Sequence, residues 1–178
     1  MMERIPEKLE LGCGTEKPDG FYGVDISDTE AADQIQDLDQ GEWDLPSDHF
    51  KIVRAIDVFE HLSNPTTFME EVWRIATPNA KIIIRGPHLS SDNWHDPTHK
   101  RLLGSRTFEH YTPNTRFDFY SDCSFEVNDK EIQFQWQPFL VKQIGFFIAN
   151  SVPQIYETTA LRNLFPATNI KFNLTPIK

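Results

Sequence analysis

The N-terminal half of the chain alternates short apolar runs with one longer helical pattern. Leu9 and Leu11 predict the end of a buried strand, and the run over 21–26 predicts a neighbouring strand. The strongest helix signal follows, because Asn64 can act as a cap and Pro65 suits a first helical position before apolar residues at helical spacing. Strands on both sides of a helix indicate an α/β fold.

The C-terminal half begins with another apolar run. Residues 80–85 hold three consecutive isoleucines and predict a fully buried central strand, which residues 86–88 break. Residues 139–149 predict a buried helix or a dimer face, and residues 151–165 predict a further helix. Residues 169–174 alternate apolar and polar positions and predict a final strand.

The segment between these halves is less regular. Residues 88–106 are polar and rich in turn formers, and a loop of this length inside a domain is usually functional or disordered. A short helix is predicted over 107–110. In residues 125–136 the alternation slips by one position, which either a two-residue turn at Asn128 and Asp129 or a bulge in a single strand would explain.

Composition narrows the classes of function. The 178 residues fit one domain, and no apolar run approaches the roughly 20 residues that a membrane span needs. The formal net charge of −10, with only 17 Lys and Arg, disfavours nucleic acid as a partner. The start of the chain carries no secretory signal, and Cys13 and Cys123 are too few for a disulfide framework, so we expect a cytoplasmic protein.

The chemistry concentrates where the first predicted strand ends. Gly12 and Gly14 remove side chains where the backbone must turn sharply and lie close to a ligand. Asp25 ends the second predicted strand, where a carboxylate can bind two ribose hydroxyls. A nicotinamide dinucleotide would need a third glycine at the position of Lys17, so a nicotinamide-dependent oxidoreductase is disfavoured.

The order Glu10-x-Gly12-x-Gly14, followed by a strand that ends in Asp25, resembles the class I S-adenosylmethionine-dependent methyltransferases, in particular the small methyltransferase-domain proteins often labelled type 11. Further segments resemble this family in the same order, namely Asp37-Leu38, the strand from Phe50 to Val53, and Asp57 to Leu62. The resemblance is clear over residues 8–112. It implies a Rossmann-like fold, with a mostly parallel sheet of seven strands or nearly so and an antiparallel last strand.

The chain departs from the family at its N-terminal region. Only about eight residues precede the first strand, so the helices that commonly cover the cofactor are not expected. Six residues separate Gly14 from Phe21, which is too few for a helical crossover, so the first helix should be lost or reduced to one turn. Glu16 also stands where the family often has a further glycine. We expect one methyltransferase-like domain over 1–178, with a cofactor-binding core at 8–86, an acceptor-side loop and strand or hairpin at 87–136, and a C-terminal helix and last strand at 137–178.

The resemblance implies S-adenosyl-L-methionine as the cofactor. Asp25 would bind the ribose hydroxyls, Asp37 the adenine amino group, and the backbone amide of Leu38 an adenine ring nitrogen. Glu10 would order the glycine loop beneath the methionine part, and Asp57 would contact the methionine end or the acceptor. The implied cofactor-binding residues are Glu10, Gly12, Cys13, Gly14, Asp25, Ile26, Asp37, Leu38 and Asp57.

A methyl group on a sulfonium is already activated, so the enzyme must mainly hold the acceptor in line and exclude water. A base is needed only when the acceptor loses a proton, and His95 and His99 are the candidate catalytic residues because imidazole titrates near neutral pH. Together with Asp96 they could instead bind a metal, but Pro97 lies between them and we expect no metal. The expected acceptor-binding residues are His88, Trp94, Lys100, Arg101 and Arg106.

These cationic side chains suit an anionic acceptor, although they could equally neutralise the protein's own acids. Glu60 and His61 are expected to belong to a structural turn before the helix. The expected function is S-adenosylmethionine-dependent methyl transfer to a small metabolite, anionic or glycosidic. The alternative is a non-catalytic binding or interaction protein with the same fold, such as a homodimer in which the partner covers the cofactor.

Overall fold

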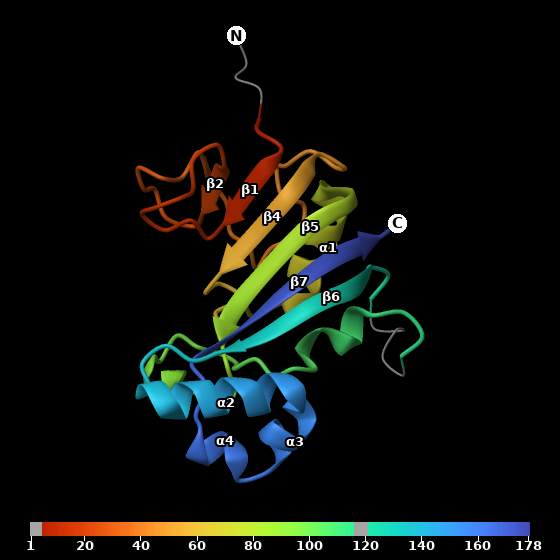
Figure 1. Cartoon of the computed structure of the whole chain (residues 1–178). Coiled ribbons are helices and arrows are strands. Elements are labelled where there is room, and N and C mark those ends of the chain that lie inside the picture. The colour runs from red at the N-terminus through yellow and green to blue at the C-terminus, as the bar shows by residue number, and fades with distance from the viewer. Residues whose placement is uncertain (1–4, 116–120) are drawn as a thin grey trace.

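A seven-stranded sheet forms the centre of the computed structural model, which describes residues 5–115 and 121–178 (Figure 1). The strand order is β3-β2-β1-β4-β5-β7-β6. Strands β1 to β5 pair in parallel, and β7 lies antiparallel between β5 and β6. The predicted Rossmann-like α/β class, with an antiparallel C-terminal strand, is confirmed. The strands are β1 (Lys8–Leu11), β2 (Tyr22–Asp25), β3 (Gln34–Ile35), β4 (Phe50–Ile56), β5 (Ala76–Pro87), β6 (Ser124–Gln133) and β7 (Asn169–Ile177).

The helices within the described residues are few and short. They are α1 (Pro65–Ile75), α2 (Phe139–Ser151), α3 (Pro153–Thr158) and α4 (Leu161–Leu164), with 3-10 helices η1 (Asn93–His95) and η2 (Thr107–Tyr111). Helix α1 begins at Pro65 as predicted, and β5 starts directly where it ends. The chain between Gly14 and Tyr22 forms turns without a helix, which confirms the predicted loss of the first crossover helix.

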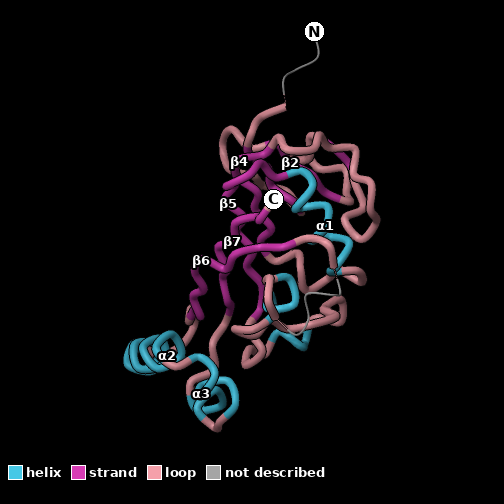
Figure 2. The backbone as a smooth tube through the Cα atoms, turned by 90° about the vertical axis from the view of Figure 1, so that its right-hand side faces the viewer, coloured by secondary structure: helices cyan, strands magenta, loops and turns pink. Residues whose placement is uncertain are grey.

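Helix α1 and the long loops cover one face of the sheet, whereas the opposite face carries no helix among the described residues (Figures 1 and 2). Side chains of the central strands accordingly alternate between buried and partly exposed. Ile82 and Ile84 are each 1% exposed, but Ile83 is only half-buried beside Arg54 of the neighbouring strand. The prediction of a fully buried central strand was therefore wrong, because such a strand needs a covering layer on both faces.

The pairing of β5 and β6 with β7 decides two further predictions about strands. Gly86 and Pro87 do not break β5, because they pair with Ile170 and Asn169 of β7. Strand β6 is continuous, with an irregularity in its pairing between Val127 and Asp129, so the bulged single strand is confirmed and the hairpin is excluded.

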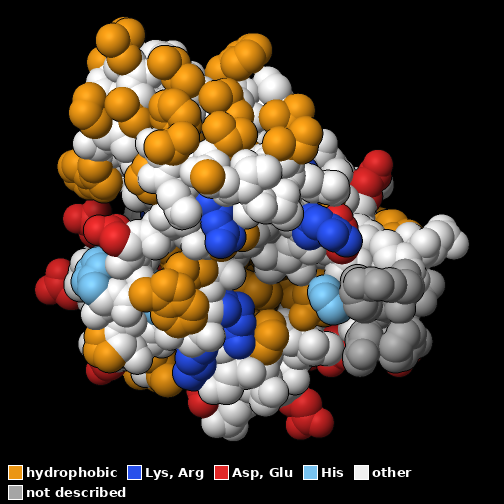
Figure 3. Space-filling view, turned by 90° about the horizontal axis from the view of Figure 1, so that it is seen from below, with side chains coloured by type: hydrophobic (Ala, Val, Ile, Leu, Met, Phe, Trp, Pro, Cys, Tyr) orange, Lys and Arg blue, Asp and Glu red, His pale blue; other side chains and the backbone are white. Residues whose placement is uncertain are grey.

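The C-terminal helices differ from their predicted form. The single helix expected over 151–165 is divided into α3 and α4, and it starts only at Pro153, since Val152 has a non-helical backbone as expected before proline. Helix α2 is not buried, because Phe139 is 73% and Phe147 72% exposed. Exposed apolar side chains gather over these helices (Figure 3). No described helix combines the length and the apolar content that crossing a membrane requires.

A row of phenylalanine rings fixes the turn after β4 in the core. Phe59 in that turn lies 5.9 Å from the ring of Phe68 on α1 and 5.1 Å from the ring of Phe108 on η2. Phe108 in turn contacts Phe172 of β7 at 4.8 Å. All four are at most 2% exposed. The turn that carries Asp57 to Leu62 is therefore anchored to the sheet, to α1 and to η2.

Candidate functional site

The loop after β1, which we call the glycine loop, requires a glycine at position 12. Gly12 has a φ of +66°, and a Cβ there would lie 2.3 Å from Cγ2 of Val58. The backbone N–H groups of Gly12 and Cys13 both donate to the carbonyl of Val24, at 2.7 and 3.1 Å. The loop is thus held against β2 on one side and against the turn after β4 on the other.

Asp25 ends β2 and organises the backbone around it. Its Oδ2 accepts a hydrogen bond from the N–H of Gly14 at 2.8 Å, and its Oδ1 accepts one from Ser27 at 2.9 Å. Each carboxylate oxygen can accept a second hydrogen bond. The carboxylate is therefore fixed in place while keeping acceptor capacity for a ligand.

A cavity of about 390 Å³ opens where β1, β2, β3 and β4 reach their carboxyl ends. Ligands of open α/β sheets bind at this edge. We call it the strand-end cavity. It is lined by Gly12, Asp25, Ile26, Asp37, Leu38, Asp39, Asp57, Val58, His61, Leu62 and Lys100.

The strand-end cavity brings together six of the expected cofactor residues and one expected acceptor residue, Lys100. The sequence analysis missed Asp39, Val58, His61 and Leu62. The sequence held a signal for Asp39, because it is a second acidic residue directly after the predicted cofactor-binding pair Asp37 and Leu38. Burial raises the pKa of Asp39, but hydrogen bonds from the backbone of Asn64 and Ser63 outweigh burial and bring it below the usual range.

The charged side chains that line the strand-end cavity are mostly acidic. The lining contains four carboxylates, those of Asp25, Asp37, Asp39 and Asp57. Among its described residues Lys100 is the only lysine. Asp57 forms an ion pair with Arg85 and has a φ of +57°, a conformation that aspartate tolerates better than most residues. Such a lining favours a cationic ligand over an anionic one.

Three expected cofactor residues do not line this cavity. Glu10 and Cys13 instead line a hollow beside Arg54, and Gly14 contributes its N–H to Asp25. Burial raises the pKa of Glu10, and Arg54, whose Nε lies 3.3 Å from Oε2 of Glu10, offsets part of this effect. The role of Glu10 in ordering the glycine loop stays a prediction.

A second cavity of about 370 Å³ adjoins the first, and Asp57 and His61 line both. We call it the histidine cavity. It is lined by Asp57, Glu60, His61, Pro87, Asn93, His95, Asp96, His99, Gln135, Trp136, Thr168 and Asn169. The two histidines expected to be catalytic, His95 and His99, therefore lie in one cavity next to the strand-end cavity.

Backbone carbonyls orient the rings of both histidines. Nδ1 of His95 lies 2.9 Å from the carbonyl of Asp92, and Nδ1 of His99 lies 2.9 Å from the carbonyl of Asn93. A carbonyl can only accept, so each neutral ring carries its proton on Nδ1 and has a lone pair on Nε2. This tautomer can accept a proton or bind a metal ion.

Glu60 forms part of the turn after β4 and is almost fully buried, with 1% of the residue exposed. Burial raises its pKa to about 7, and the nearby carboxylates of Asp57 and Asp96 act in the same direction. The sequence assigned Glu60 and His61 to a structural turn. The structure agrees about the turn and adds that both residues line the histidine cavity.

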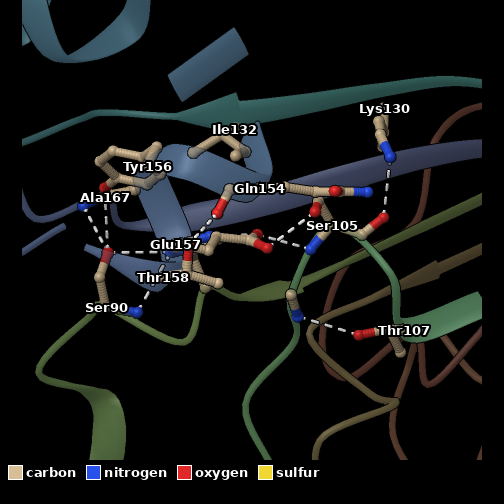
Figure 4. A network of polar contacts seen from close by, with 12 residues as sticks. Ser90, Ser105, Thr107, Lys130, Ile132, Gln154, Tyr156, Glu157, Thr158 and Ala167 are labelled. Carbon is tan, nitrogen blue, oxygen red and sulfur yellow. Dashed lines mark hydrogen bonds and ion pairs between the residues drawn. The ribbon is translucent and has the colours of Figure 1, made fainter. Parts of the chain in front are cut away.

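The other four residues expected to bind the acceptor lie outside the two cavities. His88 is 0% exposed, and its Nε2 lies 3.1 Å from Oε1 of Glu157, a residue labelled in Figure 4. Arg101 donates to the carbonyls of Phe59 and Leu62, whereas Arg106 pairs with the neighbouring Glu109, and Trp94 is 59% exposed. These contacts show Arg101 supporting the turn after β4, and an acceptor-binding role for the four residues stays a prediction.

Comparisons with known proteins agree with this geometry. Residues 6–171 match the family model described as a methyltransferase domain. Among curated proteins no match was found. Solved structures share the fold at low identity, and one is an S-adenosylmethionine-dependent methyltransferase from Archaeoglobus fulgidus with a TM-score of 0.54 and 17% identity, covering 94% of this chain and 84% of that chain.

Two other similar structures differ in what they are named for. Phosphoethanolamine N-methyltransferase 2 of Haemonchus contortus, in complex with S-adenosyl-L-methionine, has a TM-score of 0.55 and 13% identity, with 99% of this chain and 49% of that chain covered. The [4+2]-cyclase SpnF has a TM-score of 0.58 and 15% identity, with 94% and 73% covered. At these identities the likeness shows the fold alone. The family match spans most of the chain, so this protein belongs to the methyltransferase domain family, among the class I S-adenosylmethionine-dependent methyltransferases that its sequence resembles.

Proposed function

We propose that the protein binds S-adenosylmethionine in the strand-end cavity and transfers the methyl group to a small acceptor in the histidine cavity. One observation carries the proposal. In a chain of this family, Gly12 of the glycine loop and the carboxylates of Asp25 and Asp37 line one cavity at the carboxyl ends of the parallel strands. In this proposal Asp25 binds the ribose hydroxyls, and Asp37 and Leu38 bind the adenine ring.

The charge of the cavity supports this cofactor over a dinucleotide. S-adenosylmethionine supplies a methyl group that is activated by the positive charge on its sulfur. Four carboxylates in the lining attract that positive charge and would repel the pyrophosphate of a dinucleotide. In addition, the turns between Gly14 and Tyr22 offer no helix N-terminus to a pyrophosphate.

The shared wall of the two cavities supports direct transfer. Asp57 and His61 line both cavities, so a donor in one and an acceptor in the other would meet there, in line. For a hydroxyl acceptor, Nε2 of His95 or His99 would accept the proton that leaves. We propose an anionic or glycosidic acceptor; Lys100, which pairs with Asp39 in the lining of the strand-end cavity, is the cation there that could contact an anionic group.

The proposal includes the setting in which the protein acts. We propose a single domain in the cytoplasm, supported by one contiguous core and by two cysteines that are both free and buried. The acidic net charge supports a small-molecule substrate rather than nucleic acid. Exposed apolar side chains over α2 support a homodimer.

Calorimetric titration tests cofactor binding. S-adenosylmethionine and its demethylated product are titrated into the wild type, into Asp25→Asn, and into Asp44→Asn, which removes the same charge from an exposed side chain outside the cavity. We expect the wild type and Asp44→Asn to bind alike. Asp25→Asn should bind at least about tenfold more weakly, since hydrogen bonds to a charged group contribute about 1.5–3 kcal/mol.

An acceptor screen with methyl-labelled cofactor then separates the two candidate functions. Labelled product would support methyl transfer. Tight cofactor binding without product from any acceptor would favour the non-catalytic binding protein, a possibility consistent with a [4+2]-cyclase having this fold. If the wild type binds neither ligand, the proposal is wrong.

A further inference from the structure

Three potential metal ligands converge at the histidine cavity. Glu60 and His61 come from the turn after β4, and His99 comes from the loop after η1. One ligand atom of each residue can be chosen so that all lie within 4.8 Å of one another. The sequence separates His99 from the other two by almost forty positions, so only the fold brings them together.

The carboxylate of Glu60 lacks a partner for one oxygen. The residue is 1% exposed, and Oε2 accepts no hydrogen bond from any residue in the described ranges. A buried polar atom without a partner is costly, and such atoms are rare in folded proteins. A cation bound beside Glu60 would satisfy this oxygen.

Hydrogen bonds present both histidines in the form that binds metals. The hydroxyl of Thr98 donates to Asp96 at 2.6 Å, so it accepts a hydrogen bond from Nδ1 of His61 at 3.0 Å. Nδ1 of His99 donates to the carbonyl of Asn93. In its neutral form each ring therefore has a lone pair on Nε2, and Nε2 of His99 lies 3.6 Å from Oδ2 of Asp96. Histidines that bind metals almost always donate their other N–H to a carboxylate, a carbonyl or water in this way.

The two segments are also held together without a metal. The ring centroids of His61 and His99 lie 4.7 Å apart. The backbone N–H of Lys100 donates to the carbonyl of Glu60 at 2.8 Å, and Arg101 donates to the carbonyl of Phe59 at 2.9 Å. Tetrahedral coordination with bonds of about 2.0–2.1 Å places ligand atoms roughly 3.3 Å apart. Side-chain rotation on this prearranged backbone can close the difference.

We propose that Glu60, His61 and His99 form a binding site for a divalent transition-metal ion of the zinc type. Two imidazole nitrogens and one carboxylate suit such an ion, whereas Mg²⁺ and Ca²⁺ prefer oxygen ligands throughout. These three ligands differ from the group His95, Asp96 and His99, which the sequence analysis considered as a metal site and disfavoured. Three protein ligands leave a coordination position for water, and His95 remains available as a base. The metal site does not depend on the methyl-transfer proposal.

Titration of the full-length chain with zinc chloride, after treatment with a chelator, tests the site. We expect one ion per chain in the wild type. The variants His61→Gln, His99→Gln and Glu60→Gln should each bind Zn²⁺ at least about tenfold more weakly. The control His110→Gln removes an exposed histidine on η2 and should bind as the wild type does. Magnesium in excess should not compete.

A fourth variant tests the positioning of His61. Thr98→Val removes the hydroxyl that orients this ring, and we expect a loss of about 10–100-fold in Zn²⁺ affinity with an unchanged circular dichroism spectrum. Cobalt provides a second readout, since its visible spectrum reports nitrogen ligands directly. The proposal is overturned if the wild type binds no stoichiometric Zn²⁺, or if binding survives in the His61→Gln/His99→Gln double variant or depends instead on Cys13.

Discussion

Glu157 on α3 fastens the C-terminal helices to the loop that follows β5 (Figure 4). Its Oε1 accepts hydrogen bonds from Nε2 of His88 at 3.1 Å and from the backbone N–H of Ser105 at 2.6 Å, and its Oε2 accepts one from the Ser105 hydroxyl at 2.7 Å. The N–H of Ser90 donates to Nδ1 of His88 at 3.1 Å, which leaves the ring proton on Nε2, facing Glu157. Only 8% of Glu157 is exposed.

Glu157→Gln preserves the shape of the side chain but replaces one acceptor oxygen by an NH₂ group. At least one charge-assisted hydrogen bond, worth about 1.5–3 kcal/mol, is lost, and the donor left behind costs about 1–3 kcal/mol. We therefore expect the free energy of unfolding to fall by roughly 2.5–6 kcal/mol. In a domain of this size about 1 kcal/mol corresponds to roughly 2–4 °C, so Tm should fall by roughly 5–24 °C.

Thermal and urea unfolding followed by circular dichroism measure this loss. The matched control is Glu109→Gln, which removes an acid paired with Arg106 on the surface, where such pairs contribute about 0–1 kcal/mol. The free energy of unfolding of the control should lie within about 1 kcal/mol of that of the wild type. An equally small effect of Glu157→Gln would refute the reasoning, because a buried acceptor of three hydrogen bonds would then contribute no more than a surface acid.

The pH dependence gives an independent check. Burial raises the pKa of Glu157, but the hydrogen bonds from His88 and Ser105 outweigh burial, so the folded pKa lies below the usual range. The charged form therefore stabilises the fold above the unfolded pKa of about 4.3, and this stabilisation is lost as the pH falls through the folded value. The difference between the wild type and Glu157→Gln should shrink below about pH 4. A difference that stays constant into acid would contradict the assignment.

Two further predictions concern the glycine loop and the thiols. Gly12→Ala should lower the free energy of unfolding by about 1–3 kcal/mol and abolish binding of S-adenosylmethionine in calorimetry, because the new Cβ would clash with Val58. The control is Gly20→Ala, since Gly20 also has a positive φ but lies in open space. This variant should retain binding. Burial raises the pKa of Cys123 to about 11. In the variant Cys13→Ser, Cys123 is the one remaining thiol, and we expect it to react with Ellman's reagent only after unfolding. Rapid reaction of the folded variant would contradict this expectation.

The elements that could be predicted are those that local signals determine. Pro65 marks the start of α1, although the Asn64 side chain makes no capping hydrogen bond there, and Gly12 with Asp25 marks the edge of the sheet where the strand-end cavity opens. One local signal was overlooked. Pro153 disfavours a helical backbone at Val152, so it predicts that a new helix begins at Pro153. The strand that continues through Pro87 had no local signal, because its pairing partner β7 lies at the far end of the chain.

The histidine cavity could be predicted only in part for the same reason. His95 and His99 were found because they are close in sequence and lie in a polar loop. Their neighbours Glu60 and His61 follow β4, and nothing local indicates that the loop folds back onto this turn. The contact is made by tertiary hydrogen bonds, such as the one from the backbone N–H of Lys100 to Glu60.

The strand-end cavity persists without a crossover helix between β1 and β2, because polar side chains take over the role of that helix. Nζ of Lys17 donates to the carbonyl of Ala31 at 2.7 Å and pairs with Asp33, and Asp33 accepts a hydrogen bond from the N–H of Gly23 at 2.7 Å. Gly23 has no Cβ where the carbonyl of Ala31 would lie only 2.3 Å away, so the loop packs directly against β2. Lys17, which argues against a dinucleotide site, thereby holds β2 and its Asp25 in register with the glycine loop.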